Sequence, residues 1–499
     1  MAKLMPIGTS RDAIDSENVA SFLARVHPVD WKNPTARARY DLAILGAGPA
    51  GVEAAESAVR LGKSVALVER DRIGGTSLNQ GSIPSKAIIR SARALMAVRD
   101  SDEYGTALQR HPRSDFAAMM ARMHRIRTRV AEYHSVKRLQ GMGVDVFFGD
   151  ACFAGPDAIV LGDTRIAFEF ALIATGARPK SSDIPGLAHV GYRTSESIFQ
   201  VTELPARLGV IGGGPLGCEI AQAFCQLGSH VILMQNAPKF LPAEGRDAAE
   251  LLSMSLSRDG VETRLNTAVV GARREGSGKI LDTTNDERKE SIAVDEVLLA
   301  IGRSPNVENL ELAAAGVEFD CSEGVKVDQF LCTSNPRVYS AGDVCNEQKF
   351  TNAAKASGHL AVQNAMAGQR LPHTRLYIPW CTYCDPEVAH IGLHPSEARE
   401  RSIVIKSYTV MMQDVDRAIT DGQDSGFVKI HVAHPTDRIV GATIVGVRAS
   451  ELINEMAVIM SAGMGMRELA NVLHTYPARS DSIRLAALAF VQNQGPAPT

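Results

Sequence analysis

Two glycine-rich segments have the residue types and the spacing that hold the phosphates of a dinucleotide. They read Gly46-Ala47-Gly48-Pro49-Ala50-Gly51 and Gly212-Gly213-Gly214-Pro215-Leu216-Gly217. In this fingerprint the glycines permit a tight turn, close approach of the backbone to pyrophosphate and close helix packing, while helix N–H groups bind the phosphates. We therefore predict two dinucleotide sites. Their glycines are Gly46, Gly48 and Gly51 in the first and Gly212, Gly214 and Gly217 in the second.

The residue that ends the next strand differs between the two segments. Glu69 follows the first segment and is placed to accept a hydrogen bond from a ribose hydroxyl. At the matching place after the second segment stands the uncharged Gln235, and Lys239 follows nearby. Loss of the acid removes repulsion against a 2′-phosphate, and a nearby cation attracts one. We expect NADP(H) at the second site; NAD(H), with Lys239 merely solvated, stays the alternative.

The elements that must position these segments follow from the apolar pattern. Tyr40–Leu45 predicts a buried parallel strand, Pro49–Leu61 a helix and Ser64–Val68 a second strand, and the same order recurs at Arg207–Met234. Two such units imply two nucleotide-binding domains, with a duplicated scaffold lacking a second ligand as the alternative. From about residue 372, short β-rich runs and an amphipathic helix at Ser450–Gly463 indicate an antiparallel module of the kind that dimerises. The 499 residues suit about three domains.

The composition excludes several classes of function. A net charge of −3 gives no general attraction for nucleic acid or an anionic membrane. No run approaches the roughly 18 apolar residues of a membrane span, and the N-terminal residues lack the apolar core of a secretory signal. Eight scattered cysteines form no disulfide framework and suit a reducing compartment. We expect a cytoplasmic, multidomain protein without nucleic-acid partners or a membrane span.

Five ordered motifs resemble the pyridine nucleotide–disulfide oxidoreductases, a family of flavoproteins that includes dihydrolipoamide dehydrogenase, glutathione reductase and mercuric reductase. The motifs are Gly74–Lys86 around the family's redox helix, Ala174-Thr175-Gly176, Gly302-Arg303-Ser304-Pro305-Asn306, Ala341-Gly342-Asp343-Val344 and Pro379–Glu387. The resemblance covers about residues 39–490. It implies FAD at the first site, NADP(H) or NAD(H) at the second, and a homodimer.

The resemblance also assigns domains and further cofactor-binding residues. It implies an α/β fold with two Rossmann-like domains, for FAD (39–182 and 300–371) and NAD(P) (183–299), plus a C-terminal α+β dimerisation domain (372–499) after an N-terminal arm (1–38). The further cofactor-binding residues that it implies are Gly75, Thr76, Lys86, Thr175, Gly176, Glu219, Gly302, Arg303, Gly342 and Asp343. Lys86 and Glu219 match a catalytic pair near flavin N5 and the nicotinamide, where an ammonium stabilises developing negative charge. A plain interdomain ion pair is the alternative.

Two serines mark the main departure from the family. Ser77 and Ser82 stand where the family has two cysteines that pass electrons from reduced flavin to a disulfide or a metal. A serine oxygen cannot form the cross-link and has no comparable two-electron couple, so the dithiol relay is absent. A laboratory Cys→Ser change would leave the same two residues. Gln80, where the family usually has an aliphatic residue, favours a natural variant.

A second departure lies near the C-terminus. Tyr476 and Asp481 occupy the positions of the family's catalytic His–Glu pair, and a phenol with a pKa near 10 is a poor base at neutral pH. His474 is a candidate substitute acid, although a packing role is the simpler interpretation. Tyrosine at this position also resembles mercuric reductases and soluble transhydrogenases. Mercuric reductase further needs a C-terminal cysteine pair, and the last cysteine here is Cys384.

Four residues of the last motif have spacings found among zinc ligands. Cys381 and Cys384 form C-x₂-C, and His390 and His394 form H-x₃-H. The segment between the pairs is far shorter than the usual finger linker. We therefore expect no metal site and interpret the thiols as buried packing groups.

These observations predict an FAD-dependent NAD(P)H oxidoreductase that passes electrons to a small-molecule, non-thiol acceptor such as a quinone, a dye-like oxidant or oxygen. A soluble NAD(P) transhydrogenase, a non-enzymatic flavin or nucleotide sensor, and a disabled disulfide reductase stay as alternatives.

Overall fold

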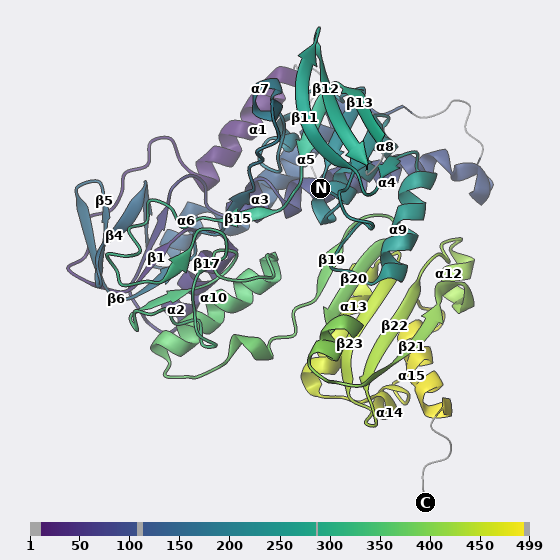
Figure 1. Ribbon diagram of the computed structural model, residues 1–499. Helices are drawn as coiled ribbons and strands as arrows, with labels where there is room; N and C mark the ends of the chain where they lie inside the picture. Colours follow the sequence, from purple (N-terminus) through teal and green to yellow (C-terminus); the bar gives the residue numbers. More distant parts are fainter. Residues whose placement is uncertain (1–10, 107–112, 286–287, 494–499) are drawn as a thin grey trace, which may run out of the picture.

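The computed structural model describes residues 11–106, 113–285 and 288–493, and its elements fall into three regions (Figure 1). The first is built on a seven-stranded sheet, the second on a four-stranded parallel sheet, and the third on a five-stranded antiparallel sheet. The predicted α/β fold with a separate C-terminal α+β region is confirmed. Among the described residues, no helix combines the length and apolarity that a bilayer crossing requires.

The first sheet is centred on β1 (Tyr40–Leu45), which pairs in parallel with β2 (Val65–Glu69) and β6 (Thr164–Ile173). Alternate residues of β1 enter two different cores, Leu42 with Ile44 on one face and Ala43 with Leu45 on the other. This burial on both faces explains the continuous apolar run, because helices or loops cover both faces of a parallel sheet. The sheet is completed by β3 (Val144–Phe148), β4 (Ala151–Gly155), β5 (Ala158–Leu161) and β18 (Val338–Ser340).

Two helices pack closely beside the first glycine segment. They are α2 (Pro49–Arg60) and α10 (Thr351–Met366). A Cβ atom at Gly358 would lie 2.3 Å from the carbonyl oxygen of Ala50, so the two helices touch backbone to backbone. This contact brings the start of α10 to the same end of the sheet as the glycine segment.

The second region repeats the first in its order of elements. Its parallel sheet contains β8 (Arg207–Ile211), β9 (His230–Met234), β10 (Glu262–Arg264) and β14 (Glu296–Leu299), with α8 (Pro215–Leu227) and α9 (Arg246–Arg258). An antiparallel sheet of β11 (Ala268–Glu275), β12 (Gly278–Asn285) and β13 (Arg288–Val294) projects from it (Figure 1). The chain crosses between the first two regions at β7 (Ala177–Pro179) and β15 (Arg303–Pro305), which pair with each other.

The third region is an antiparallel sheet with helices. Its strand order is β19 (Trp380–Thr382), β20 (Glu387–Gly392), β23 (Ile439–Gly446), β22 (Phe427–Ala433) and β21 (Ile405–Met411). The helices α13 (Ala449–Ala462) and α15 (Asp481–Asn493) contribute Ile453 and Phe490 to its core. The predicted β-rich runs and amphipathic helix therefore form one packed unit.

The N-terminal helix α1 (Arg11–Val26) lies against the first region. Phe22 and Val26 pack with Leu78 and Ala131, so the arm covers the short helix that carries Ser77.

The remaining helices are α3 (Gly75–Asn79), α4 (Ser82–Arg99), η1 (Ser101–Tyr104), α5 (Phe116–Ala131), η2 (Glu132–His134), α6 (Val136–Gly141), α7 (Leu187–Val190), η3 (Ile198–Gln200), η4 (His373–Arg375), α11 (Pro395–Glu400), η5 (Met412–Asp414), α12 (Asp416–Thr420) and α14 (Met466–Leu469), and the remaining strands are β16 (Phe319–Asp320) and β17 (Gly324–Val325).

Candidate active site

A cavity of about 770 Å³ opens at the carboxyl edge of the first sheet. Its size is that of a site for a small molecule or cofactor. Residues predicted for the first cofactor line it: Gly46, Gly48, Glu69, Gly75, Thr76, Thr175, Gly176, Arg303, Gly342 and Asp343, together with Ser77 and Ser82. Motifs that are far apart in the sequence therefore converge on one space.

The first glycine segment has the geometry of a phosphate-binding turn. Gly46 has a φ of +103°, and a Cβ at Gly51 would lie 1.9 Å from the Gly46 carbonyl oxygen. Gly48 is the N-cap of α2, whose first residue is Pro49. The free N–H groups of that helix start therefore face the cavity, where they can bind phosphate.

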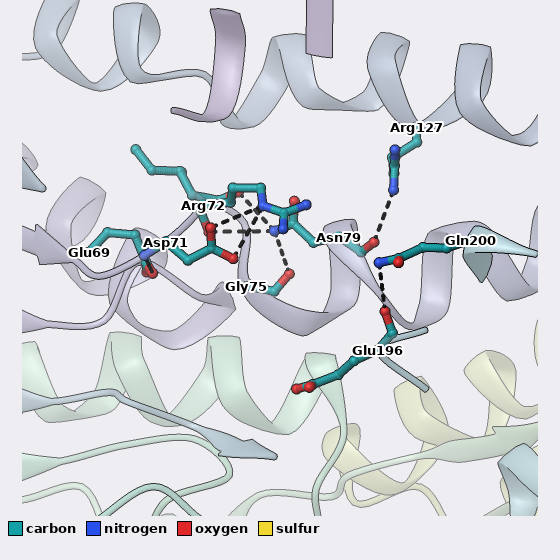
Figure 2. Close-up of polar contacts among 9 residues, drawn as sticks. Glu69, Asp71, Arg72, Gly75, Asn79, Arg127, Glu196 and Gln200 are labelled. Carbon is teal, nitrogen blue, oxygen red and sulfur yellow. Dashed lines mark hydrogen bonds and ion pairs between the residues drawn. The ribbon is translucent and has the colours of Figure 1, made fainter. Parts of the chain in front are cut away.

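Glu69 is held at the end of β2 by backbone hydrogen bonds. Its carboxylate accepts from the N–H groups of Ala47 and Asp71, each at 2.8 Å. Burial raises the pKa of Glu69, while these two hydrogen bonds oppose that rise. Figure 2 shows Glu69 and Asp71 beside the α3 segment that starts at Gly75. The carboxylate is thus positioned at the turn, where a ribose hydroxyl can donate to it.

The second glycine segment repeats this geometry with one change of charge. Gly212 has a φ of +109°, and a Cβ at Gly217 would lie 1.9 Å from the Gly212 carbonyl oxygen. Gln235 Oε1 accepts a hydrogen bond from Gly213 N at 3.2 Å, the contact that Glu69 makes with Ala47 in the first segment. A neutral amide thus occupies the place that the carboxylate of Glu69 takes at the first turn.

Lys239 lies in the loop between β9 and α9, shortly after Gln235. Its ammonium donates to the carbonyl oxygen of Glu244 in the loop before α9. This hydrogen bond holds the side chain within its own loop.

Lys86 and Glu219 meet as predicted, between the first two regions. Lys86 Nζ lies 2.8 Å from Glu219 Oε2 and 3.0 Å from Oε1. Glu219 is buried and also accepts from the backbone N–H of Tyr383 at 2.9 Å. The Tyr383 ring lies under the ammonium, 4.3 Å from Nζ to the ring centroid. These contacts hold the Lys86 ammonium in one direction, and Tyr383 is a participant that sequence reasoning missed.

The two serines lie on the cavity wall. Ser77 Oγ is hydrogen-bonded to Thr351 Oγ1 at 2.5 Å, and Ser82 is the first residue of α4. Asn79 of the same short helix donates to the carbonyl oxygens of Gly75 and Ile73, and Figure 2 shows the first of these bonds. Of the residues that line the cavity, all in the described part of the chain, none is cysteine.

Arg303 connects three of the predicted motifs. It donates to Thr76 Oγ1 at 3.2 Å and to the Ala177 carbonyl oxygen, and its Nε lies 3.5 Å from Asp343 Oδ2. Burial raises the pKa of Asp343, and the nearby Arg303 opposes that rise. Thr175 Oγ1 donates to the Asn306 carbonyl oxygen at 2.7 Å, which ties the two domain crossings together.

The C-terminal motif does not form a dyad between Tyr476 and Asp481. The exposed Tyr476 hydroxyl donates to Asp416 Oδ2 at 2.7 Å, and this contact raises the pKa of the phenol. Asp481 instead pairs with Arg484 at 2.9 Å. His474 Nε2 lies 2.6 Å from Glu455 Oε1, an arrangement that holds His474 in the fold.

Comparison with known proteins gives the family. Residues 40–359 match the family described as pyridine nucleotide-disulphide oxidoreductase, and residues 378–487 match its dimerisation domain. The chain belongs to the pyridine nucleotide-disulphide oxidoreductase family. Family members are FAD-dependent oxidoreductases that use NAD(P)H, and the dimerisation domain supports a homodimer.

Relatives with several activities are similar over nearly the whole chain. A mercuric reductase from Staphylococcus aureus is 30% identical over 452 residues (90% of this chain, 82% of the relative). A dihydrolipoyl dehydrogenase from Thermus scotoductus is 32% identical over 461 residues (90% and 97%). Among solved structures, LpdA from Mycobacterium tuberculosis superposes with a TM-score of 0.82 at 26% identity (90% and 99%). The HOCl-induced flavoprotein disulfide reductase RclA from Escherichia coli gives 0.80 at 26% identity (90% and 99%).

Proposed function

We propose that this family member passes electrons from NAD(P)H through bound FAD to a small-molecule acceptor that is not a disulfide, such as a quinone, a dye-like oxidant or oxygen. The observation that carries this proposal is the cavity wall. Two serines stand at the relay positions, Ser77 is hydrogen-bonded to Thr351, and no cysteine lines the cavity among the described residues. Two serine hydroxyls cannot be oxidised to a disulfide and reduced again, so the electrons must leave the flavin by another route.

The residues of the cavity fit FAD. A Cβ at Gly48 would meet only the Gly75 Cα, at 3.9 Å, so a pyrophosphate can approach the backbone there, and Glu69 and Asp343 offer carboxylates to hydroxyl groups. Bound FAD would supply the two-electron exchange between the nicotinamide and the acceptor. The chain itself binds and orients the two cofactors at the carboxyl edges of its two parallel sheets.

Lys86 has the role of an oriented cation in this proposal. Its ammonium is fixed by both oxygens of Glu219 and by the Tyr383 ring. A fixed positive charge stabilises negative charge that develops beside it without reorganisation at the moment of reaction. Glu219 acts through Lys86 and is a positioning residue.

The exposed C-terminal surface supports a role for a second copy of the chain. Leu473 and Tyr476 have 93% and 77% of their surface exposed, although they lie in the matched dimerisation domain. An exposed leucine and tyrosine of this kind suit an interface with another protein. Tyr476 is a neutral phenol at physiological pH, and its hydroxyl, once it leaves Asp416, can donate a hydrogen bond to an acceptor bound in the partner, in place of the family's imidazolium.

A parallel acceptor screen tests the proposal. The purified flavoprotein is given NADPH or NADH with a quinone, ferricyanide, oxygen, lipoamide or glutathione disulfide, and nicotinamide oxidation is followed. We expect turnover with at least one of the non-thiol acceptors and only background with both disulfides. Brisk turnover with either disulfide, or none with any non-thiol acceptor, contradicts the proposal.

A soluble transhydrogenase is the second candidate. The neutral Gln235 supports it, since an amide at the ribose position repels neither the 2′-hydroxyl of NAD(H) nor the 2′-phosphate of NADP(H). Reduction of an NAD⁺ analogue by NADPH tests it. A rate no faster than that of free FAD eliminates this candidate.

A further inference from the structure

Three buried side chains from two regions of the fold converge away from the cofactor cavity. Glu244 lies in the loop before α9, His390 lies in β20 and His394 immediately precedes α11. The candidate ligand atoms of these three residues lie within 4.8 Å of one another. Sequence reasoning grouped the two histidines with Cys381 and Cys384; the structure groups them with Glu244 instead, a residue more than a hundred positions earlier in the chain.

Two polar atoms of this cluster are buried without a hydrogen-bond partner. They are Glu244 Oε2 and His394 Nε2, which face each other across 3.7 Å. The side chains are only 4% and 9% exposed. A buried polar atom without a hydrogen-bond partner costs folding free energy. A group bound between these two facing atoms would remove that cost from both.

We propose that Glu244, His390 and His394 bind a divalent transition-metal ion of the Zn²⁺ type. Two ligand atoms about 2.1 Å from a tetrahedral ion lie roughly 3.4 Å apart, close to the separation of the two unpaired atoms. The nearest His390 nitrogen lies within 4.8 Å of these two atoms, and the His390 ring must turn out of its stack on His394 to direct that nitrogen at the ion. Two imidazole nitrogens and one carboxylate oxygen suit Zn²⁺ and neighbouring ions better than Mg²⁺ or Ca²⁺, which prefer oxygen ligands.

The surroundings orient the proposed ligands. Trp380 Nε1 donates to Glu244 Oε1 at 2.6 Å and leaves Oε2 turned toward His394. His390 is bonded to Thr443 Oγ1 at 2.8 Å through Nδ1 and to the Gly392 carbonyl oxygen at 3.1 Å through Nε2. The nitrogen that binds the ion must exchange its present hydrogen bond for the metal, and a hydrogen bond at the other nitrogen then fixes the ring, as is usual for ligating histidines. The two imidazole rings are stacked, with centroids 3.5 Å apart.

The position of the cluster gives the ion a defined effect. It would link the Glu244 loop of the second region to the sheet of the third. Trp380, which contacts the cluster, also stacks on Phe350 of the cofactor cavity, with ring centroids 6.0 Å apart and planes within 5°. A bound ion would therefore fix the relative position of two regions close to the cavity without entering it.

Metal content of the flavin-loaded protein tests the site. The protein is treated with chelator, equilibrated with Zn²⁺ and analysed for bound zinc and flavin. We expect one Zn²⁺ per chain, and an affinity at least roughly tenfold weaker in Glu244→Gln and in His394→Gln. Glu244→Gln keeps an acceptor for Trp380, and the flavin content shows whether each variant is folded.

A matched control is offered by a surface pair of the same residue types. His230 Nε2 and Glu262 Oε2 also lie 3.7 Å apart, but their side chains are 58% and 35% exposed. His230→Gln should bind zinc like the unchanged protein. Crystals of the unchanged protein soaked in Zn²⁺ should show an anomalous peak between Glu244 and His394. Absence of stoichiometric zinc, absence of that peak, or undiminished binding in both ligand variants overturns the proposal and leaves a buried acid–imidazole pair.

Discussion

Removal of the Lys86 ammonium should slow the transfer of hydride to the bound flavin. In Lys86→Met the side chain is shorter by one atom, keeps most of its apolar stem and loses the charge that Glu219 fixes at 2.8 and 3.0 Å. Loss of one preorganised electrostatic contact of this kind costs about 10²–10³ in rate, or about 2.7–4 kcal/mol. Since the Lys86 side chain is 33% exposed, water screens part of its charge, and we expect a fall of about 10².

The design must separate catalysis from stability. Lys86→Met leaves the carboxylate of Glu219 buried without its partner, which costs about 3 kcal/mol or more of folding free energy. The double change Lys86→Met with Glu219→Gln removes both charges and keeps an acceptor for Tyr383 N. Glu219→Gln alone keeps the ammonium and loses its orientation, so we expect a loss of about tenfold, or about 1.4 kcal/mol.

The assay is anaerobic stopped-flow reduction of the flavin by saturating NADPH, followed by flavin absorbance. Lys137→Met, which removes an exposed lysine from α6, is the control and should reduce at the unchanged rate. Reduction at the unchanged rate in the Lys86→Met and Glu219→Gln double variant would refute the role of the oriented cation. The pair would then be an interdomain ion pair only.

Three further changes test the cofactor sites. Gly51→Ala places a Cβ 1.9 Å from the Gly46 carbonyl oxygen, so we expect protein without bound FAD, whereas Gly62→Ala, where the added Cβ meets nothing within 4 Å, should retain it. Gln235→Glu restores the acid at the second ribose position and should shift the ratio of kcat/KM for NADH over NADPH at least about tenfold toward NADH, or about 1.4 kcal/mol; an unchanged ratio counts against the assignment. Burial raises the pKa of Glu69, so the FAD-free protein should lose stability as the pH rises from the usual carboxyl range through that raised pKa, and urea unfolding of Glu69→Gln should show a shallower dependence. The same variant should bind FAD about ten- to a hundredfold more weakly by equilibrium dialysis, since a charged hydrogen bond is worth about 1.5–3 kcal/mol.

The parts of the site that follow from local chemistry could be predicted from the sequence. The turn at Gly46, the packing of Gly51 and the place of Glu69 are consequences of a strand, a turn and a helix in succession. The repeat of that pattern predicted the second sheet, including Gln235 at the place that Glu69 takes in the first region. The contact between Lys86 and Glu219 followed from the resemblance, because the two residues match a pair that meets in the family.

The contacts that could not be predicted join residues that no local pattern connects. Ser77 meets Thr351 because α2 and α10 pack backbone to backbone. Glu244 meets His394 because a loop of the second region lies on the sheet of the third. The Lys239 ammonium donates to the Glu244 carbonyl oxygen because the fold of their shared loop brings the two groups together. These pairings depend on tertiary packing and on which of several polar groups lies nearest.

The most direct test of the central claim is an anaerobic titration of the flavin with NADPH. With no dithiol to share the electrons, one equivalent of NADPH per bound flavin should complete the loss of the oxidised flavin spectrum, and no thiolate-to-flavin charge-transfer band should form. Uptake of two equivalents, or appearance of that band, would show that a thiol pair elsewhere in the chain exchanges electrons with the flavin and would contradict the account.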